Sequence, residues 1–251
     1  MNSLGEGYVR SLQGYFNKIN KIEKVKLYYR GQQCKIEDGY YLKPSISRFE
    51  FLINKLPYEF RKYEEEVLLI FENHLRGHAG YEAKDVWELL ALAQHHGLPT
   101  RFMDWTTNPL VGLFFAVESN HQLDGDVWCN GFLSTNNCLP SSTHIARRLA
   151  IGKVDIIYYP SHVSQRITNQ SGCFTIHESG DPIDKSVHIM YSGLTRLKIR
   201  AAKKSTILDE LYNLGVHRGF IYPGLDGVTM KLRYEVTVSH ARYTKVKHVQ
   251  M

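Results

Sequence analysis

Long apolar runs, a secretory signal and paired cysteines are all missing from this chain of 251 residues. Its longest apolar stretch, residues 110–117, is interrupted by Gly112 and is much shorter than the about 20 residues that a membrane-spanning helix needs. The N-terminal residues carry neither a basic flank nor an apolar core, which argues against a secretory signal. We therefore expect a cytoplasmic protein without a membrane partner.

The four cysteines are far apart in the sequence and form no Cys-x-x-Cys pair: they are Cys34, Cys129, Cys138 and Cys173. No histidines stand at a spacing that would complete a zinc site with them. A chain of this length buries a sizeable core without a disulfide framework. We therefore expect reduced thiols and no metal.

Apolar residues make up 43% of the chain and aromatic residues 12%, which excludes intrinsic disorder at a net charge of only +6. Residues 1–125 carry 15 Lys and Arg against 16 Asp and Glu, whereas residues 126–251 carry 16 against 9. A basic second half suits an anionic partner such as nucleic acid or a nucleotide. Excess lysines on a solvated face explain the same numbers, and charge alone favours that explanation.

Apolar periodicity predicts helices in the first half of the chain and mainly short strands in the second. The helices are expected at residues 6–20, 58–76, 84–96 and 109–118, and the last of them is apolar on nearly all sides and therefore buried. One early strand, over residues 24–29, ends at Arg30 and Gly31 in a tight turn. Later strands are expected at residues 154–159, 172–177, 194–199 and 220–222, with a helix at 206–214.

The segment 229–238 fits a strand by its alternation and a helix by the spacing of Val228, Leu232 and Val236. Neither a repeat nor a linker divides the chain. The pattern therefore predicts one α+β domain over residues 1–251, helical first and strand-rich later.

Two stretches concentrate polar groups where buried structure is expected. Tyr28-Tyr29-Arg30-Gly31-Gln32 delivers an arginine whose planar fork suits a phosphate or ribose, and Gly31 lets a ligand approach closely. The run 94–110 places Gln, His, Arg, Asp and Thr between two buried helices, which is costly unless these groups pair or line a site. An Arg101–Asp104 ion pair that braces the turn is an equally good explanation, as is a structural carboxylate for Arg30.

These residues resemble the signature of the FRG domain family, which is named for a (Phe/Tyr)-Arg-Gly motif. The matching sequences are Tyr-Arg-Gly-Gln from Tyr29, His-His-Gly-Leu-Pro-Thr-Arg from His95, and Asp-Trp-Thr-Thr-Asn-Pro-Leu from Asp104. Residues 166–174 and 221–227 look like two later signatures of the family. The resemblance covers residues 28–227 and implies a single FRG-type domain with N- and C-terminal extensions packed on it.

The motif order of the family is similar to that of ADP-ribosyltransferase folds, which implies a helical N-terminal half on a mostly antiparallel, split-sheet core. By this resemblance Arg30 ends the first strand, Thr106 lies in the strand before the apolar helix, and Gln170 replaces a late Glu or Gln. The implied activity is that of an enzyme using NAD or another nucleotide, with a nucleic acid or protein acceptor. The company that the family keeps implies a role in conflict between bacteria and phages.

Breaking the nicotinamide–ribose bond of NAD passes through an oxocarbenium-like state that needs electrostatic stabilisation. The resemblance nominates four catalytic residues: Arg30, Asp104, Gln170 and His96. It assigns nucleotide contacts to Arg30, Gln32, Arg101, Trp105, Thr106 and Phe174, with the aromatic rings stacking on nicotinamide. Because glutamine is no general base, a carboxylate from Asp104 or Asp226 would serve better than Gln170. His96 fits a simple helix-dipole role equally well, and Asp226 fits a turn or helix cap.

Two other classes of function compete with this hypothesis. One is a module that binds a nucleotide or a modified base without catalysis. The other is a nuclease or glycosylase, although the sequence lacks the carboxylate clusters of a metal-dependent nuclease. A Glu-x-Glu or Gln-x-Glu pair is also missing, which argues against transfer to protein arginine.

Overall fold

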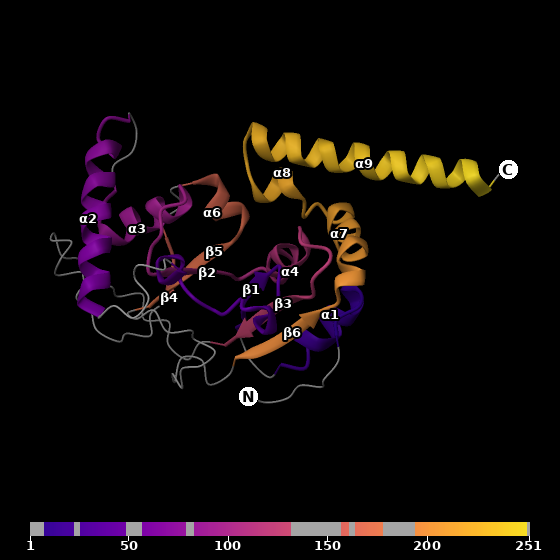
Figure 1. Cartoon of the computed structure of the whole chain (residues 1–251), viewed down its shortest axis with the longest axis horizontal. Coiled ribbons are helices and arrows are strands. Elements are labelled where there is room, and N and C mark those ends of the chain that lie inside the picture. The colour runs from indigo at the N-terminus through magenta and orange to yellow at the C-terminus, as the bar shows by residue number, and fades with distance from the viewer. Residues whose placement is uncertain are drawn as a thin grey trace.

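The computed structural model describes residues 8–22, 26–48, 57–78, 83–131, 157–160, 164–177 and 194–249. At its centre lies a six-stranded sheet with the order β4-β5-β2-β1-β3-β6, in which all paired strands are antiparallel (Figure 1). The strands are β1 (Tyr28–Gln32), β2 (Phe102–Thr106), β3 (Gly125–Asn130), β4 (Ile157–Tyr158), β5 (Gly172–Ile176) and β6 (Thr195–Ile199). The predicted α+β class with a mostly antiparallel sheet is confirmed.

The described part of the chain also contains eight α-helices. They are α1 (Leu12–Ile19), α2 (Pro57–Leu75), α3 (Val86–His95), α4 (Pro109–Val117), α6 (Gln165–Asn169), α7 (Lys204–Asn213), α8 (Arg218–Ile221) and α9 (Leu225–Val249). Short 3-10 helices add Ile36–Asp38, Ser45–Arg48 and Ala201–Lys203. Figure 1 shows α2 at one side of the molecule and α9 extending past the body at the other.

The distribution of these elements corrects several expectations. Strands β1 and β2 come from the first half, and the longest described helix, α9, comes from the second. The strand expected at 220–222 is part of helix α8 and the turn after it, and the ambiguous segment 229–238 is helical. Arg30 and Gly31 lie inside β1 rather than after it. Residues 24–25 and 154–156 of two predicted strands, and Cys138, lie outside the described residues.

Local sequence explains why the central helix α4 begins where it does. The Asn108 side chain accepts a hydrogen bond from the backbone N–H of Leu110 at 2.9 Å, and Pro109 occupies the first helical position. Asp85 caps α3 in the same way, since its carboxylate accepts from the N–H groups of Trp87 and Glu88. Both predicted helices are therefore observed, and α3 begins at Val86 rather than at residue 84.

Two glycines let α4 lie directly on the centre of the sheet. A Cβ on Gly31 would stand 2.1 Å from the carbonyl oxygen of Gly112, and a Cβ on Gly112 would stand 2.6 Å from the Cβ of Tyr29. Gly31 of the Tyr-Arg-Gly motif is therefore needed for helix packing. The interior of α4 forms one apolar core with α1, α7 and the adjoining strands, as its all-round apolar sequence predicts.

The sheet opens between β1 and β2. These two strands share the single registered pair Tyr29–Thr106, whereas β1 shares five pairs with β3 and β2 shares five with β5. Away from Tyr29 and Thr106, β1 and β2 therefore separate. We call this point the fork of the sheet.

Candidate functional site

A cavity of about 330 Å³ occupies the fork, and we call it the fork cavity. Residues from both strands and from three helices line it, together with Ser45. They are Tyr29, Arg30 and Gly31 of β1, Asp104, Trp105 and Thr106 of β2, Gln94, Gly97 and Leu98 around the end of α3, Phe115 of α4, and Arg166 and Gln170 of α6 and its C-cap. Sequence segments that carry the quoted motifs thus converge on one concave surface.

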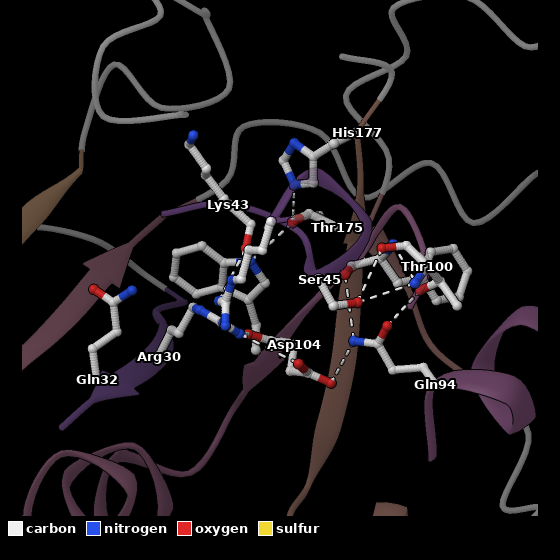
Figure 2. A network of polar contacts seen from close by, with 12 residues as sticks. Arg30, Gln32, Lys43, Ser45, Gln94, Thr100, Asp104, Thr175 and His177 are labelled. Carbon is white, nitrogen blue, oxygen red and sulfur yellow. Dashed lines mark hydrogen bonds and ion pairs between the residues drawn. The ribbon is translucent and has the colours of Figure 1, made fainter. Parts of the chain in front are cut away.

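Asp104 is the only carboxylate among the described residues that line the fork cavity. Arg30 donates from Nη1 to the backbone oxygen of Asp104 at 2.7 Å and to Oδ2 at 3.4 Å. From the other side, Gln94 donates from Nε2 to Oδ1 at 3.0 Å, so both carboxylate oxygens are oriented (Figure 2). The Asp104 side chain is nevertheless 61% exposed, which leaves it open to a ligand.

A further layer of hydrogen bonds fixes the orientation of Gln94. The Thr100 hydroxyl donates to Oε1 of Gln94, which leaves the amide N–H groups for Asp104 and for the carbonyl of Phe102. Thr100 is held in turn by Ser45, whose hydroxyl accepts from the Thr100 N–H at 3.0 Å. Figure 2 shows this chain running from Ser45 to Asp104, whereas Gln32 lies apart from it. The carboxylate is therefore held in place before any ligand arrives.

Arg166 is the second cation of the fork cavity. Ser164 caps α6 and so sets the start of the helix that carries Arg166. The guanidinium lies over the ring of Tyr222, 5.2 Å from its centroid, and forms no ion pair with any carboxylate in the described part of the chain. Burial lowers the pKa of the neighbouring His95, and the positive charge of Arg166 lowers it further. Arg166 is thus positioned by an aromatic ring and available to an anion.

Two aromatic residues assigned to nicotinamide stacking are buried instead. The Trp105 indole is 2% exposed and donates to the Thr175 hydroxyl at 2.9 Å, so its ring belongs to the core even though the residue borders the cavity. Phe174 is 5% exposed and stacks on Phe102 at a centroid distance of 5.0 Å. Neither ring presents a face to a ligand, because apolar neighbours cover both.

Arg101 and Gln32 also hold structural positions. Arg101 forms a buried ion pair with Glu64 of α2, and its backbone N–H donates to the same carboxylate at 2.8 Å. The expected partner Asp104 instead binds Arg30. Gln32 accepts a hydrogen bond from the Trp128 indole at 2.7 Å and donates to the carbonyl of Tyr41. Both side chains lie outside the lining of the fork cavity.

Thr106 and Gln170 border the fork cavity, but their polar atoms join elements of the fold. The Thr106 hydroxyl donates to the backbone oxygen of Gln170 at 2.6 Å. The Gln170 amide donates to the carbonyl of Ile221 in α8 at 3.1 Å. The structure thus brings both residues to the predicted site and gives each a positioning contact.

His96 and Asp226 lie outside the fork cavity. His96 is the C-cap of α3 and is exposed, with its ring edge-on to that of His95 at 4.9 Å. Asp226 is exposed in the first turn of α9. Both residues thus lie at helix ends, as expected for the helix-dipole role of His96 and the turn or cap role of Asp226 that were the alternatives to catalysis.

Comparison with known proteins supports the motif analysis over part of the chain. Residues 25–125 match the model of the FRG domain. Over these residues the chain is similar to the FRG domain. Comparisons with curated proteins and with solved structures return no match. The expected likeness to ADP-ribosyltransferase folds therefore stays a prediction.

The FRG match includes Arg30, Gln94 and Asp104 but ends before Arg166 and Gln170. Sequence reasoning missed Gln94 and Arg166 as site residues, although both stand inside the quoted motifs. Their positions in the sequence could have indicated both residues, since Gln94 directly precedes the two histidines and Arg166 begins the Arg-Ile signature. Ser45 carried no such signal, because it reaches the site from a separate 3-10 helix.

The described residues of this chain hold no group of three or more His, Cys, Asp or Glu side chains arranged for a metal ion. Within the same residues, no helix combines the length and apolarity that crossing a membrane would take. Cys34, Cys129 and Cys173 are buried and form no disulfide. The charged side chains that line the fork cavity are Arg30, Asp104 and Arg166.

Proposed function

We propose that the FRG-domain chain is a nucleotide-utilising enzyme of ADP-ribosyltransferase type, which cleaves the nicotinamide–ribose bond of NAD in the fork cavity. The observation that carries this proposal is that an oriented, exposed carboxylate, Asp104, and a guanidinium without an ion pair among the described residues, Arg166, line the same cavity. The carboxylate would face the positive charge that develops on the ribose, and the guanidinium would face the negative pyrophosphate. The setting that we infer is conflict between bacteria and phages.

Asp104 would act on the reacting ribose. As the bond between C1′ and the nicotinamide nitrogen breaks, nicotinamide leaves with the electron pair and positive charge develops on the ribose. A fixed carboxylate stabilises that charge and can accept a hydrogen bond from a ribose hydroxyl. Water or an acceptor nucleophile then bonds to C1′ and releases its proton to solvent, which gives free ADP-ribose or a modified acceptor.

Arg166 would bind the pyrophosphate, since a guanidinium fork donates two parallel hydrogen bonds to phosphate oxygens. Arg30 is better suited to hold Asp104 than to bind phosphate, because its Nη1 is engaged by the carbonyl and carboxylate of that residue. The fork cavity of about 330 Å³ lies at the small end of ligand sites, about 300–1,000 Å³. It would enclose the nicotinamide ribose, and the adenosine half would extend along its rim.

The test is nicotinamide release from NAD by the full chain, measured by chromatography. Asp104→Asn keeps the shape and loses the charge, so we expect kcat to fall by about 100-fold or more with a small change in KM. Arg166→Ala should raise KM instead. Asp226→Asn is the matched control, because this exposed aspartate lies outside the fork cavity. Equal turnover by Asp104→Asn and the control would overturn the assignment.

A second candidate, a module that binds a nucleotide without turnover, is favoured by one feature. Both oxygens of Asp104 already accept hydrogen bonds, from Arg30 and from Gln94. A carboxylate held this firmly serves recognition as well as catalysis. An NAD-dependent rise in melting temperature without nicotinamide release would select the binding module, and the absence of both would remove NAD as the ligand.

A further inference from the structure

A second cavity, of about 570 Å³, lies beyond the C-terminus of α4, between that helix end, α8 and the first half of α9. We call it the α4–α9 cavity. Phe115 borders the fork cavity, and Glu118 borders the α4–α9 cavity three residues further along the chain. Tyr222 separates the two, since its ring contacts Phe115 edge-on at 6.4 Å and carries Arg166 on its face.

Glu118 is the polar centre of the α4–α9 cavity, and its side chain is nine-tenths buried. The Tyr222 hydroxyl donates toward both carboxylate oxygens, at 2.9 and 3.1 Å. Gln33 donates to Oε1 at 3.3 Å, and Asn120 fixes the Gln33 amide by donating to its oxygen at 2.9 Å. Burial raises the pKa of Glu118, while Tyr222, Arg218, Gln33 and Arg166 oppose that rise.

These contacts leave part of the carboxylate unused. A carboxylate has about four acceptor positions. Tyr222 supplies one proton shared between the two oxygens, and Gln33 supplies one more to Oε1. The Nε of Arg218 stands 4.0 Å from Oε2, beyond hydrogen-bond distance. A ligand with two adjacent N–H donors would therefore complete the coordination of a buried anion.

The walls of the α4–α9 cavity suit a flat ring that ends in an anion. Tyr222, Tyr234 and Met230 provide aromatic and apolar surface beside Glu118. Arg233 lines the same cavity, is exposed, and forms no ion pair in the described part of the chain. Ring stacking and an accessible guanidinium are the features that proteins use for a base and its phosphate.

We propose that the α4–α9 cavity binds a guanine nucleotide, with the N1–H and N2–H groups of the base donating to Glu118 and the phosphate on Arg233. Guanine is the natural base that presents two neighbouring N–H donors. Adenine and cytosine carry a ring nitrogen that accepts hydrogen bonds beside their amine. The lone pair of that nitrogen would face a carboxylate oxygen and be repelled by it. Free guanosine monophosphate and a guanine exposed in single-stranded nucleic acid share this chemistry.

This inference does not depend on the proposed cleavage of NAD, because none of its contacts involves Asp104. Titration calorimetry of the full chain with guanosine, inosine and adenosine monophosphates tests it. Inosine lacks only the N2 amine, so we expect it to bind about tenfold or more weakly than guanosine monophosphate. Equal affinities for these two ligands, or no binding of guanosine monophosphate, would overturn the proposal.

Variants locate the binding. Glu118→Gln should abolish the preference for guanosine over inosine monophosphate, whereas Glu235→Gln, an exposed partner of Lys231 on α9, should keep it. Because Glu118→Gln alters a buried network, Arg233→Ala provides a second test on an exposed residue. Arg233→Ala should weaken the binding of guanosine monophosphate and leave the affinity for guanosine unchanged. Asp104→Asn should bind guanosine monophosphate normally, so failure of this site and failure of the fork cavity are distinguishable.

A second arm identifies the source of the base. A single-stranded oligonucleotide with one guanine is compared with the same sequence carrying inosine. Tighter binding of the guanine oligonucleotide than of the free nucleotide indicates nucleic acid, and the reverse indicates a free nucleotide. The proposal is contradicted if neither the free nucleotides nor the oligonucleotides bind more tightly with guanine than with inosine.

Discussion

At the scale of single residues, the buried ion pair of Arg101 and Glu64 joins the start of β2 to α2. Arg101→Met would leave the Glu64 carboxylate buried without its cation, so we expect the free energy of unfolding to fall by about 3–5 kcal/mol. Arg76→Met removes an arginine from an exposed pair with Glu72 and should cost less than about 1 kcal/mol. Urea denaturation measures both, and similar losses would contradict the structural role of Arg101.

Arg196 makes the stability depend on pH through Glu37. Hydrogen bonds from the Arg196 guanidinium lower the pKa of Glu37 from 4.5 to about 2. A carboxylate with a lowered folded-state pKa stabilises the fold above its unfolded pKa, and this contribution is lost as the pH falls toward the folded value. We expect Glu37→Gln to show a smaller drop in melting temperature between about pH 5 and pH 2 than the unmodified chain. Asp38→Asn, an exposed neighbour, is the control and should keep the larger drop.

The partners of charged residues show what sequence cannot supply. Arg101 and Asp104 are three residues apart, which makes a local ion pair the natural interpretation. The structure pairs Arg101 with Glu64 and Asp104 with Arg30, at sequence separations of 37 and 74 residues. Residue type therefore identified groups that need a partner, but only the packing of α2 and β1 decided which partner each receives.

At the scale of elements, α6 is anchored to α8 by two side chains. Asn169 donates to the carbonyl of Phe220 at 2.7 Å and Gln170 to that of Ile221 at 3.1 Å. Asn169→Ala and Gln170→Ala should each lower the free energy of unfolding by about 1–2 kcal/mol, because each leaves a carbonyl without its donor. Thermal and urea denaturation give these values.

The same pair of variants separates anchoring from catalysis. Both loosen α6, which carries Arg166, so both should raise KM for NAD to a similar extent while kcat changes little. A fall of kcat in Gln170→Ala alone would show that Gln170 contacts the reacting atoms, because Asn169 does not line the fork cavity.

Elements with a one-sided apolar pattern or clear caps were predictable, whereas those covered on both faces or left exposed were not. Helix α4 begins at Pro109, as expected, whereas α3 begins at Val86, two residues after its expected start. Strand β3 is buried along its whole length and shows no alternation, so it was missed. In α9 the apolar residues Leu225, Val228, Leu232 and Val236 are exposed. Hydropathy therefore could not tell whether residues 229–238 form a strand or a helix.

At the scale of the whole molecule, the FRG match and the folded unit have different extents. The match ends at residue 125, but the fork cavity also needs Arg166 and Gln170. The α4–α9 cavity takes most of its lining from residues 218–237. The matched residues thus supply the carboxylate of Asp104 and its supports Arg30 and Gln94, and later segments supply Arg166 and most of the lining of the α4–α9 cavity.

The strand order predicts that residues 25–125 do not fold on their own. Within that segment β1 and β2 share one registered pair, while their full partners β3 and β5 lie almost entirely beyond residue 125. Helix α4 would likewise lose the apolar surface of α7 and β6. We expect the isolated segment to give a narrow amide dispersion in its proton–nitrogen NMR spectrum and no cooperative melting, whereas the full chain melts cooperatively. A dispersed spectrum from residues 25–125 would show instead that the fork of the sheet is stable without its outer strands.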